Sequence, residues 1–174
     1  MLKTESDTPS STSEERSAYD QFLADGFFIR PVDDVEALNL IRCEIATLAA
    51  AELEDLAPED PDTFLNGFHT RVLVDTFSDV WLAVFHKFNG MDDARPRYFA
   101  LARQARHWII ENDRCMQRLI NLSIHLPEDD SSLLHIHADA LKGGSPSKFF
   151  QWIPLVDCHA RSRCLSCRRP RTPQ

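Results

Sequence analysis

The chain has 174 residues, 43% hydrophobic and 26% charged, which is ordinary for one globular domain with a real core. Its net charge is −8, although residues 159–174 hold five arginines and no acidic residue, so the rest of the chain is more acidic still. An acidic body argues against nucleic acid as the main partner. The sequence shows neither a secretory signal nor an apolar run long enough to span a membrane, so we expect a cytoplasmic protein with no membrane partner.

The spacing of apolar residues in the first two thirds of the chain predicts mainly helices. We expect residues 1–14, rich in serine, threonine and acids, to be disordered. Helical spacing of apolar residues predicts a helix over 15–24 that Asp25 and Gly26 end, and another from Asp33 or Asp34 to about residue 53. Residues 27–32, between these helices, predict a short strand. A connection over 54–68 leads to two further predicted helices, at about 73–88 and 95–111.

After residue 118 the pattern changes to period two. Residues 119–126, 133–139 and 149–156 predict three strands, separated by a turn at 127–130 and a loop at 142–147. Helices first and strands second predict an α+β fold, in which the helices pack on a largely antiparallel sheet.

A His-x-Asp pair, His137 and Asp139, falls on the second of these strands. Residues two apart on a strand point the same way with Cα atoms about 7 Å apart, so this imidazole and carboxylate can converge on one metal ion. With a distant histidine they would form the facial triad of non-haem iron(II) oxygenases. The same alternation also describes the solvent-facing side of a half-buried strand. His135, four residues from Asp139, is too far along the strand to share the ion and belongs at the rim.

Two further groups of polar residues are candidates for binding. One face of the first predicted strand carries Asn121, Ser123 and His125. This face could hydrogen-bond an acidic cosubstrate or substrate, or it could simply face solvent. The C-terminal segment offers a competing metal motif, which consists of four soft ligands within ten residues: Cys158, His159, Cys164 and Cys167. This motif supports a non-catalytic zinc-binding or interaction protein as the alternative function. With no export signal, the five cysteines are expected to be free thiols.

Two stretches resemble a known enzyme family. DQFLADGFFIRPV and the helix after it resemble the start of phytanoyl-CoA dioxygenase-like proteins, and NLSIHLPEDDSSLLHIHADALKGGSPSKFFQWIPLVDC is similar to the sporadic iron(II)- and 2-oxoglutarate-dependent oxygenases of bacterial carbohydrate-biosynthesis clusters. The resemblance implies metal ligation by His137 and Asp139, with 2-oxoglutarate as cosubstrate. The polar face of Asn121 and Ser123 is then a candidate for binding that cosubstrate. The resemblance also implies a small-molecule, sugar-linked substrate. The fold it implies is a double-stranded β-helix, a jelly-roll relative, decorated by N-terminal helices.

The chain also departs from the family's pattern. Leu141 and Lys148 replace an aromatic and an acidic residue, and the strands that would carry a second histidine and an oxoglutarate-binding arginine do not follow Cys158. We therefore expect a partial oxygenase domain over 15–158 with an incomplete jelly-roll sheet, and an unstructured basic tail over 159–174. A frameshift or truncation after Cys158 would account for the break. With two of three ligands assigned, we expect the chain to have little or no oxygenase activity.

Overall fold

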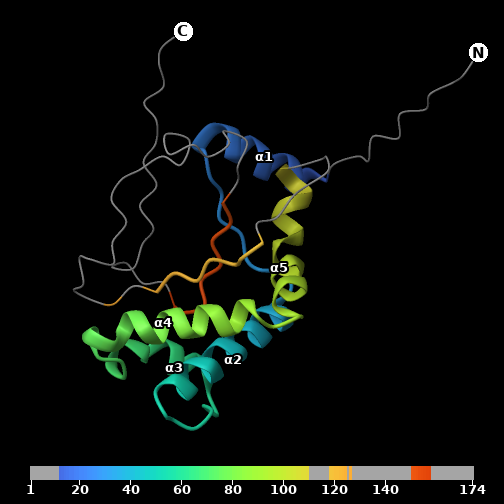
Figure 1. Ribbon diagram of the computed structural model, residues 1–174. Coiled ribbons are helices and arrows are strands. Elements are labelled where there is room, and N and C mark those ends of the chain that lie inside the picture. Colours follow the sequence, from blue (N-terminus) through green and yellow to red (C-terminus); the bar gives the residue numbers. More distant parts are fainter. Residues whose placement is uncertain (1–11, 110–117, 125, 127–149, 158–174) are drawn as a thin grey trace, which may run out of the picture.

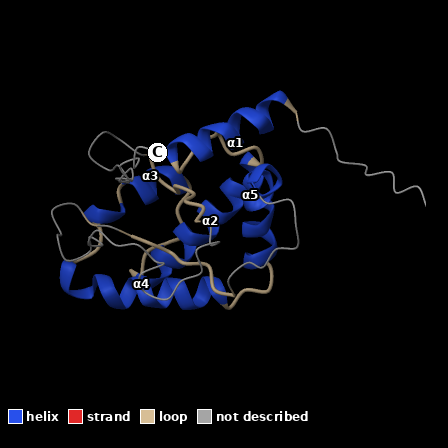
Figure 2. Ribbon diagram, turned by 90° about the horizontal axis from the view of Figure 1, so that it is seen from above, coloured by secondary structure: helices blue, strands red, loops and turns tan. Residues whose placement is uncertain are grey.

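The fold is a body of helices crossed by two extended segments (Figure 1). The computed structural model describes residues 12–109, 118–124, 126 and 150–157. In chain order the helices are α1 (Ser13–Asp25), α2 (Val35–Glu52), α3 (Pro61–Asn66), the short 3-10 helix η1 (Phe68–Thr70), α4 (Val74–Asn89) and α5 (Ala94–Ile109). Helix α2 contacts α3, α4 and α5, whereas α1 contacts α5. In Figure 1, α5 stands crosswise to α4, and Figure 2 shows the same arrangement from above.

Local signals at the helix ends account for where the helices begin. Helix α1 begins with a capping box, in which Thr12 accepts from the Glu15 amide while the Glu15 carboxylate accepts from the Thr12 amide. It ends at Gly26, whose φ of 80° suits a residue without a side chain. Asp34 caps the start of helix α2, because its carboxylate accepts from the Ala37 amide at 2.9 Å.

The core lies where α2 meets α4 and α5. Helix α2 contributes mostly small and branched side chains, which allow its neighbours to approach closely, and Val84 of α4 is almost fully buried. Ile120, in the extended segment 118–124, and Leu126 are buried in the same cluster. The buried residues of α2 are Ala37, Ile41, Ile45, Ala46, Ala49 and Ala50.

The four helices predicted from periodicity are confirmed, each within two residues of its predicted ends. Helix α3 falls inside the region predicted as a connection. Its start has a recognisable signature, because Asp60 accepts from the amides of Asp62 and Thr63 and Pro61 occupies the first turn. A short capped helix can therefore lie within a segment whose composition is typical of a loop.

The predicted α+β class, with helices packed on an incomplete jelly-roll sheet, is wrong for the part of the chain that the structure describes. That part contains helices and irregular segments but no strand. Residues 27–32 form an irregular connection in which Ile29 is 78% exposed. The segments 118–124 and 150–157 are irregular as well, and their main-chain groups bond to helix side chains instead of to a neighbouring strand. The predicted strand at 133–139 lies outside the described residues.

Candidate functional site

The first extended segment, residues 118–124, is held along α4. Asn89, the last residue of α4, accepts the Ile120 amide at 2.7 Å and donates its own amide hydrogens to the carbonyl oxygens of Ile120 (3.0 Å) and Phe85 (2.9 Å). Two turns earlier on α4, the indole of Trp81 donates to the Leu122 carbonyl at 2.7 Å and stacks on Phe85. Helix α4 therefore satisfies main-chain groups of residues 120 and 122, as a neighbouring strand would in a sheet.

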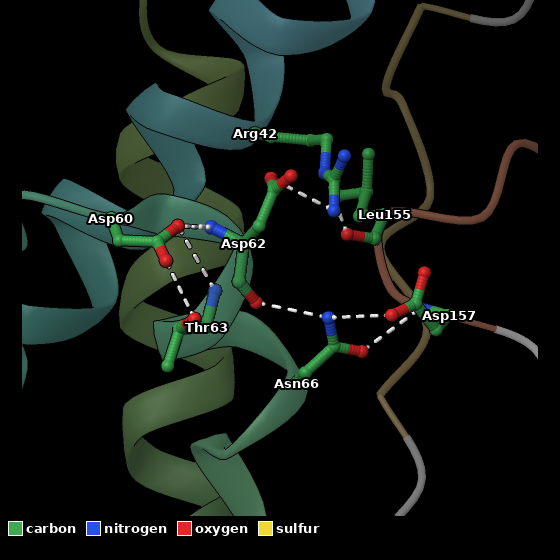
Figure 3. Close-up of polar contacts among 7 residues, drawn as sticks. All are labelled: Arg42, Asp60, Asp62, Thr63, Asn66, Leu155 and Asp157. Atoms are coloured by element: carbon green, nitrogen blue, oxygen red, sulfur yellow. Dashed lines mark hydrogen bonds and ion pairs between the residues drawn. The ribbon is translucent and has the colours of Figure 1, made fainter.

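The second extended segment, residues 150–157, is held by α2, α3 and α5. Figure 3 shows Arg42 donating from Nε to the Leu155 carbonyl at 2.9 Å while its Nη2 pairs with Asp62 at 2.8 Å. Asn66, the last residue of α3, accepts the Asp157 amide at 2.8 Å and donates to the Asp157 carboxylate at 3.3 Å.

The start of this second segment is bound by α5. The Tyr98 hydroxyl donates to the Gln151 carbonyl at 3.3 Å, and the Gln151 side-chain amide donates back to the Leu101 carbonyl at 3.4 Å. Burial raises the pKa of Tyr98, because the phenolate is poorly solvated among the packed side chains. The segment is thus attached to the helical body at both of its ends.

An acidic pair at the start of α3 gives this region its local electrostatics. The hydroxyl of Thr63 donates to Asp60 at 2.6 Å, and together with the Thr63 and Asp62 amides it lowers the pKa of Asp60. Arg42 adds a weaker attraction in the same direction. The carboxylates of Asp60 and Asp62 are therefore used locally, as a helix cap and as the partner of Arg42, and are not turned toward one another as a ligand pair (Figure 3).

The alternation predicted for residues 119–126 is confirmed where it can be seen. Ile120 and Leu126 are buried and Leu122 and Ile124 are partly buried, whereas Asn121 and Ser123 are exposed on the opposite side. The two polar residues predicted to bind a cosubstrate therefore share one exposed face. Their role in binding 2-oxoglutarate stays a prediction.

The predicted metal ligands His137 and Asp139 lie outside the described residues, as do His135 and the four residues of the zinc motif, Cys158, His159, Cys164 and Cys167. Among the described residues, no three His, Cys, Asp or Glu side chains gather where they could hold a metal ion. Whether the chain suits iron(II) is therefore judged from the donor atoms that His137 and Asp139 would supply. One imidazole nitrogen and one carboxylate oxygen match two of the three protein donors of a facial triad.

The residues that sequence reasoning missed are those that attach the two extended segments, above all Arg42, Asn66 and Asn89. A sequence signal for two of them exists, because Asn66 and Asn89 are each followed by glycine and each is the last residue of a helix. The direction in which the side-chain amide points from a helix end is set by tertiary packing. A pattern in a single sequence contains no information about that packing, so these contacts could not be predicted.

Three comparisons with known proteins found no relative of the chain. No family model, curated protein or solved structure matches the chain. Of the helices that the structure describes, none has the length and apolar character required to cross a membrane.

Proposed function

We propose that the chain carries part of the site of an iron(II)- and 2-oxoglutarate-dependent dioxygenase that hydroxylates a carbohydrate-related biosynthetic intermediate. The observation that carries the proposal is the His137-x-Asp139 pair within residues 121–158, the stretch that resembles such oxygenases. The resemblance supplies the substrate class, and it also leaves the third protein ligand unassigned. Turnover by this chain alone is therefore expected to be low.

Two features of the described residues support the proposal. The His137–Asp139 pair lies within residues 127–149. The segments on either side of that range are both attached to the helical body by hydrogen bonds between helix side chains and main-chain groups of the segments. The exposed face of the first segment presents the amide of Asn121 and the hydroxyl of Ser123, groups that can hydrogen-bond a carboxylate.

The assigned roles follow from the donor chemistry. His137 and Asp139 would hold the metal through a ring nitrogen and a carboxylate oxygen. Asn121 and Ser123 would orient 2-oxoglutarate by hydrogen bonds. When bound, the metal supplies the oxidation in which O₂ converts 2-oxoglutarate to succinate and CO₂ and places a hydroxyl on a substrate C–H carbon.

Metal titration of the full 174-residue chain tests the proposal. Co(II), which has a visible absorption spectrum, stands in for iron(II) and is added with 2-oxoglutarate in the absence of O₂. We expect His137→Ala and Asp139→Ala each to weaken Co(II) binding at least about 10-fold, because each removes one ligand.

His135→Ala is the matched control, since His135 lies two residues from His137 but is too far from Asp139 to share the ion. We expect it to leave the Co(II) affinity within about two-fold of the wild type, an effect far below that of losing a ligand. Co(II) binding that survives His137→Ala, or that is lost on Cys164→Ser, would refute the assignment. The second result would favour the zinc-binding alternative.

A further inference from the structure

Helix α1 lies outside the hydrophobic core of the described residues. It contacts only α5 among the described helices, whereas α2 contacts three others. In Figures 1 and 2, α1 lies at the edge of the helical body and meets α5 there. Its one buried side chain is that of Ala18, which is 0% exposed and does not belong to the core cluster that α2, α4 and α5 share. The attachment of α1 is therefore separate from the packing that holds the core.

The face that α1 turns toward the body offers little apolar surface. Five residues at helical spacing are less exposed than the rest of the helix: Glu15, Ala18, Gln21, Phe22 and Asp25. The larger apolar side chains of Tyr19 and Leu23 are 44% and 65% exposed. A buried alanine lets two helices approach closely, but it removes less apolar area from water than a buried leucine would. Apolar burial alone therefore holds α1 weakly.

The helical state of α1 also depends on its attachment. The helix has 13 residues, and isolated helices shorter than about 12–15 residues are marginal in water even in favourable sequences. Leaving α5 and unfolding are therefore expected to be one event. The connection to α2 is irregular over residues 26–34, and Val32 within it packs against the core. The event is thus confined to α1 and the first residues of the connection.

Opposite charge attracts α1 and α5 to one another. Helix α1 contains four acidic residues and one arginine, so its net charge is −3. Helix α5 contains no acidic residue and four arginines, of which Arg97 pairs with Asp93 just before the helix. The other three are Arg95, Arg103 and Arg106. Charges in water attract over about one Debye length, which is about 10 Å at 0.1 M salt, so the attraction between touching helices depends on ionic strength.

We propose that α1 is an electrostatic latch on α5. In the closed state it is helical and docked. In the open state it leaves α5 and unfolds, while the core of α2, α4 and α5 stays intact. Rising ionic strength favours the open state, because salt screens the attraction between the two helices. The latch does not involve the metal site, so its failure would leave the proposed function untouched.

Hydrogen–deuterium exchange of the full chain tests the latch without any substitution. We expect the amides of α1 to exchange at least about 100-fold faster than the core amides of α2, because they open without global unfolding. Raising KCl from about 0.05 M to about 0.5 M shortens the screening length from about 14 Å to about 4 Å and should speed exchange in α1 about 3-fold or more. Exchange in α2, the internal control, should not respond in this way.

Ala18→Leu opens the latch without changing its charge. Leucine is nearly as good a helix former as alanine, but a site that is 0% exposed has no room for the added carbons. We expect exchange in α1 to speed up about 10-fold or more, while the urea midpoint of the core stays at the wild-type value. The matched control is Ser17→Leu, which adds the same side chain at an exposed position of the same helix and should not speed exchange.

Glu15→Gln and Glu14→Gln compare two neighbouring charges. Each removes one negative charge from the first turn of α1, and glutamine at position 15 can keep the reciprocal bond of the capping box. Glu15 lies on the less exposed face and Glu14 is exposed. We expect Glu15→Gln to speed exchange in α1 about 2- to 3-fold and to weaken its response to salt, with a smaller effect of Glu14→Gln.

Two kinds of result would overturn the inference. Exchange in α1 as slow as in α2, or a urea midpoint lowered by Ala18→Leu, would show that α1 unfolds only together with the core. Exchange in α1 that does not respond to salt, or that responds equally in Glu15→Gln and the wild type, would show that charge does not hold the helix. The salt response of the wild type decides the matter if a variant fails to fold.

Discussion

Replacing Arg42 by methionine should destabilise the protein far more than the same change at Arg71. Arg42 is 15% exposed, and its Nε donates to the partly buried Leu155 carbonyl. A hydrogen bond from a charged donor contributes about 1.5–3 kcal/mol, and the partly buried carbonyl loses this partner. The ion pair with Asp62 adds at most about 1 kcal/mol, because that carboxylate is 57% exposed. Methionine keeps the apolar stem and the helix propensity of arginine.

These terms give an expected loss of about 1.5–4 kcal/mol for Arg42→Met, against a total stability of about 5–15 kcal/mol. Arg71 is the matched comparison, because it also pairs with an aspartate, Asp55, but both partners are about half exposed, at 50% and 46%. Its guanidinium also lies 5.1 Å from the centre of the Phe64 ring. We expect Arg71→Met to cost about 1 kcal/mol or less.

Urea unfolding followed by circular dichroism at the helix band measures both variants against the wild type. The difference between them should appear as a lower midpoint for Arg42→Met at an unchanged slope. Equal losses for the two variants, or a loss below about 0.5 kcal/mol for Arg42→Met, would show that the bond to Leu155 does not hold the 150–157 segment as argued.

Two predictions concern pH. The lowered pKa of Asp60 means that its contribution to stability is present above about pH 4, the ordinary value for aspartate, and is lost as the pH falls through the folded-state pKa. Thr63→Val removes the main cause, so the pKa of Asp60 should rise toward its ordinary value in a carboxyl-carbon NMR titration; an unchanged titration would contradict this cause. The raised pKa of Tyr98 has the opposite sign, so its contribution is complete below about pH 10 and is lost as the pH rises through the folded-state pKa. Tyr98→Phe should make urea midpoints less sensitive to pH above about 10, and an unchanged sensitivity would assign the alkaline loss to other groups.

The helices could be predicted from the sequence because their signals are local. The capping box of Thr12 and Glu15, the cap at Asp34 and the period of about 3.6 residues in α2 all lie within one helix. The same local reasoning overlooked α3, whose six residues are too few for a period to be recognised. Its cap at Asp60 and proline at Pro61 were the available signal.

The predicted sheet failed for a different reason. Alternation in residues 119–126 correctly predicted which side faces the core, because Ile120 is buried and Asn121 is exposed. Alternation says nothing about what the main chain bonds to, and here Asn89 and Trp81 take the place of a neighbouring strand. A period of two therefore predicted burial correctly and strand pairing wrongly. The predicted ligands His137 and Asp139 are outside the described residues, and their role stays a prediction.

The two Asn–Gly helix ends have a consequence for how the protein ages. Asparagine before glycine is prone to deamidation, because the glycine nitrogen can attack the side-chain carbonyl carbon with little steric hindrance. The attack closes a five-membered imide ring and releases the side-chain nitrogen as ammonia, and addition of water opens the ring to leave a carboxylate. In the folded chain the nitrogens of Gly67 and Gly90 donate to helix carbonyls, so this attack requires the last turn to open first. The carboxylate formed at residue 89 would face the Phe85 and Ile120 carbonyl oxygens that the amide had donated to. The new negative charge would repel the segment that the asparagine had held. Deamidation at a helix end would therefore make later opening of that helix turn easier.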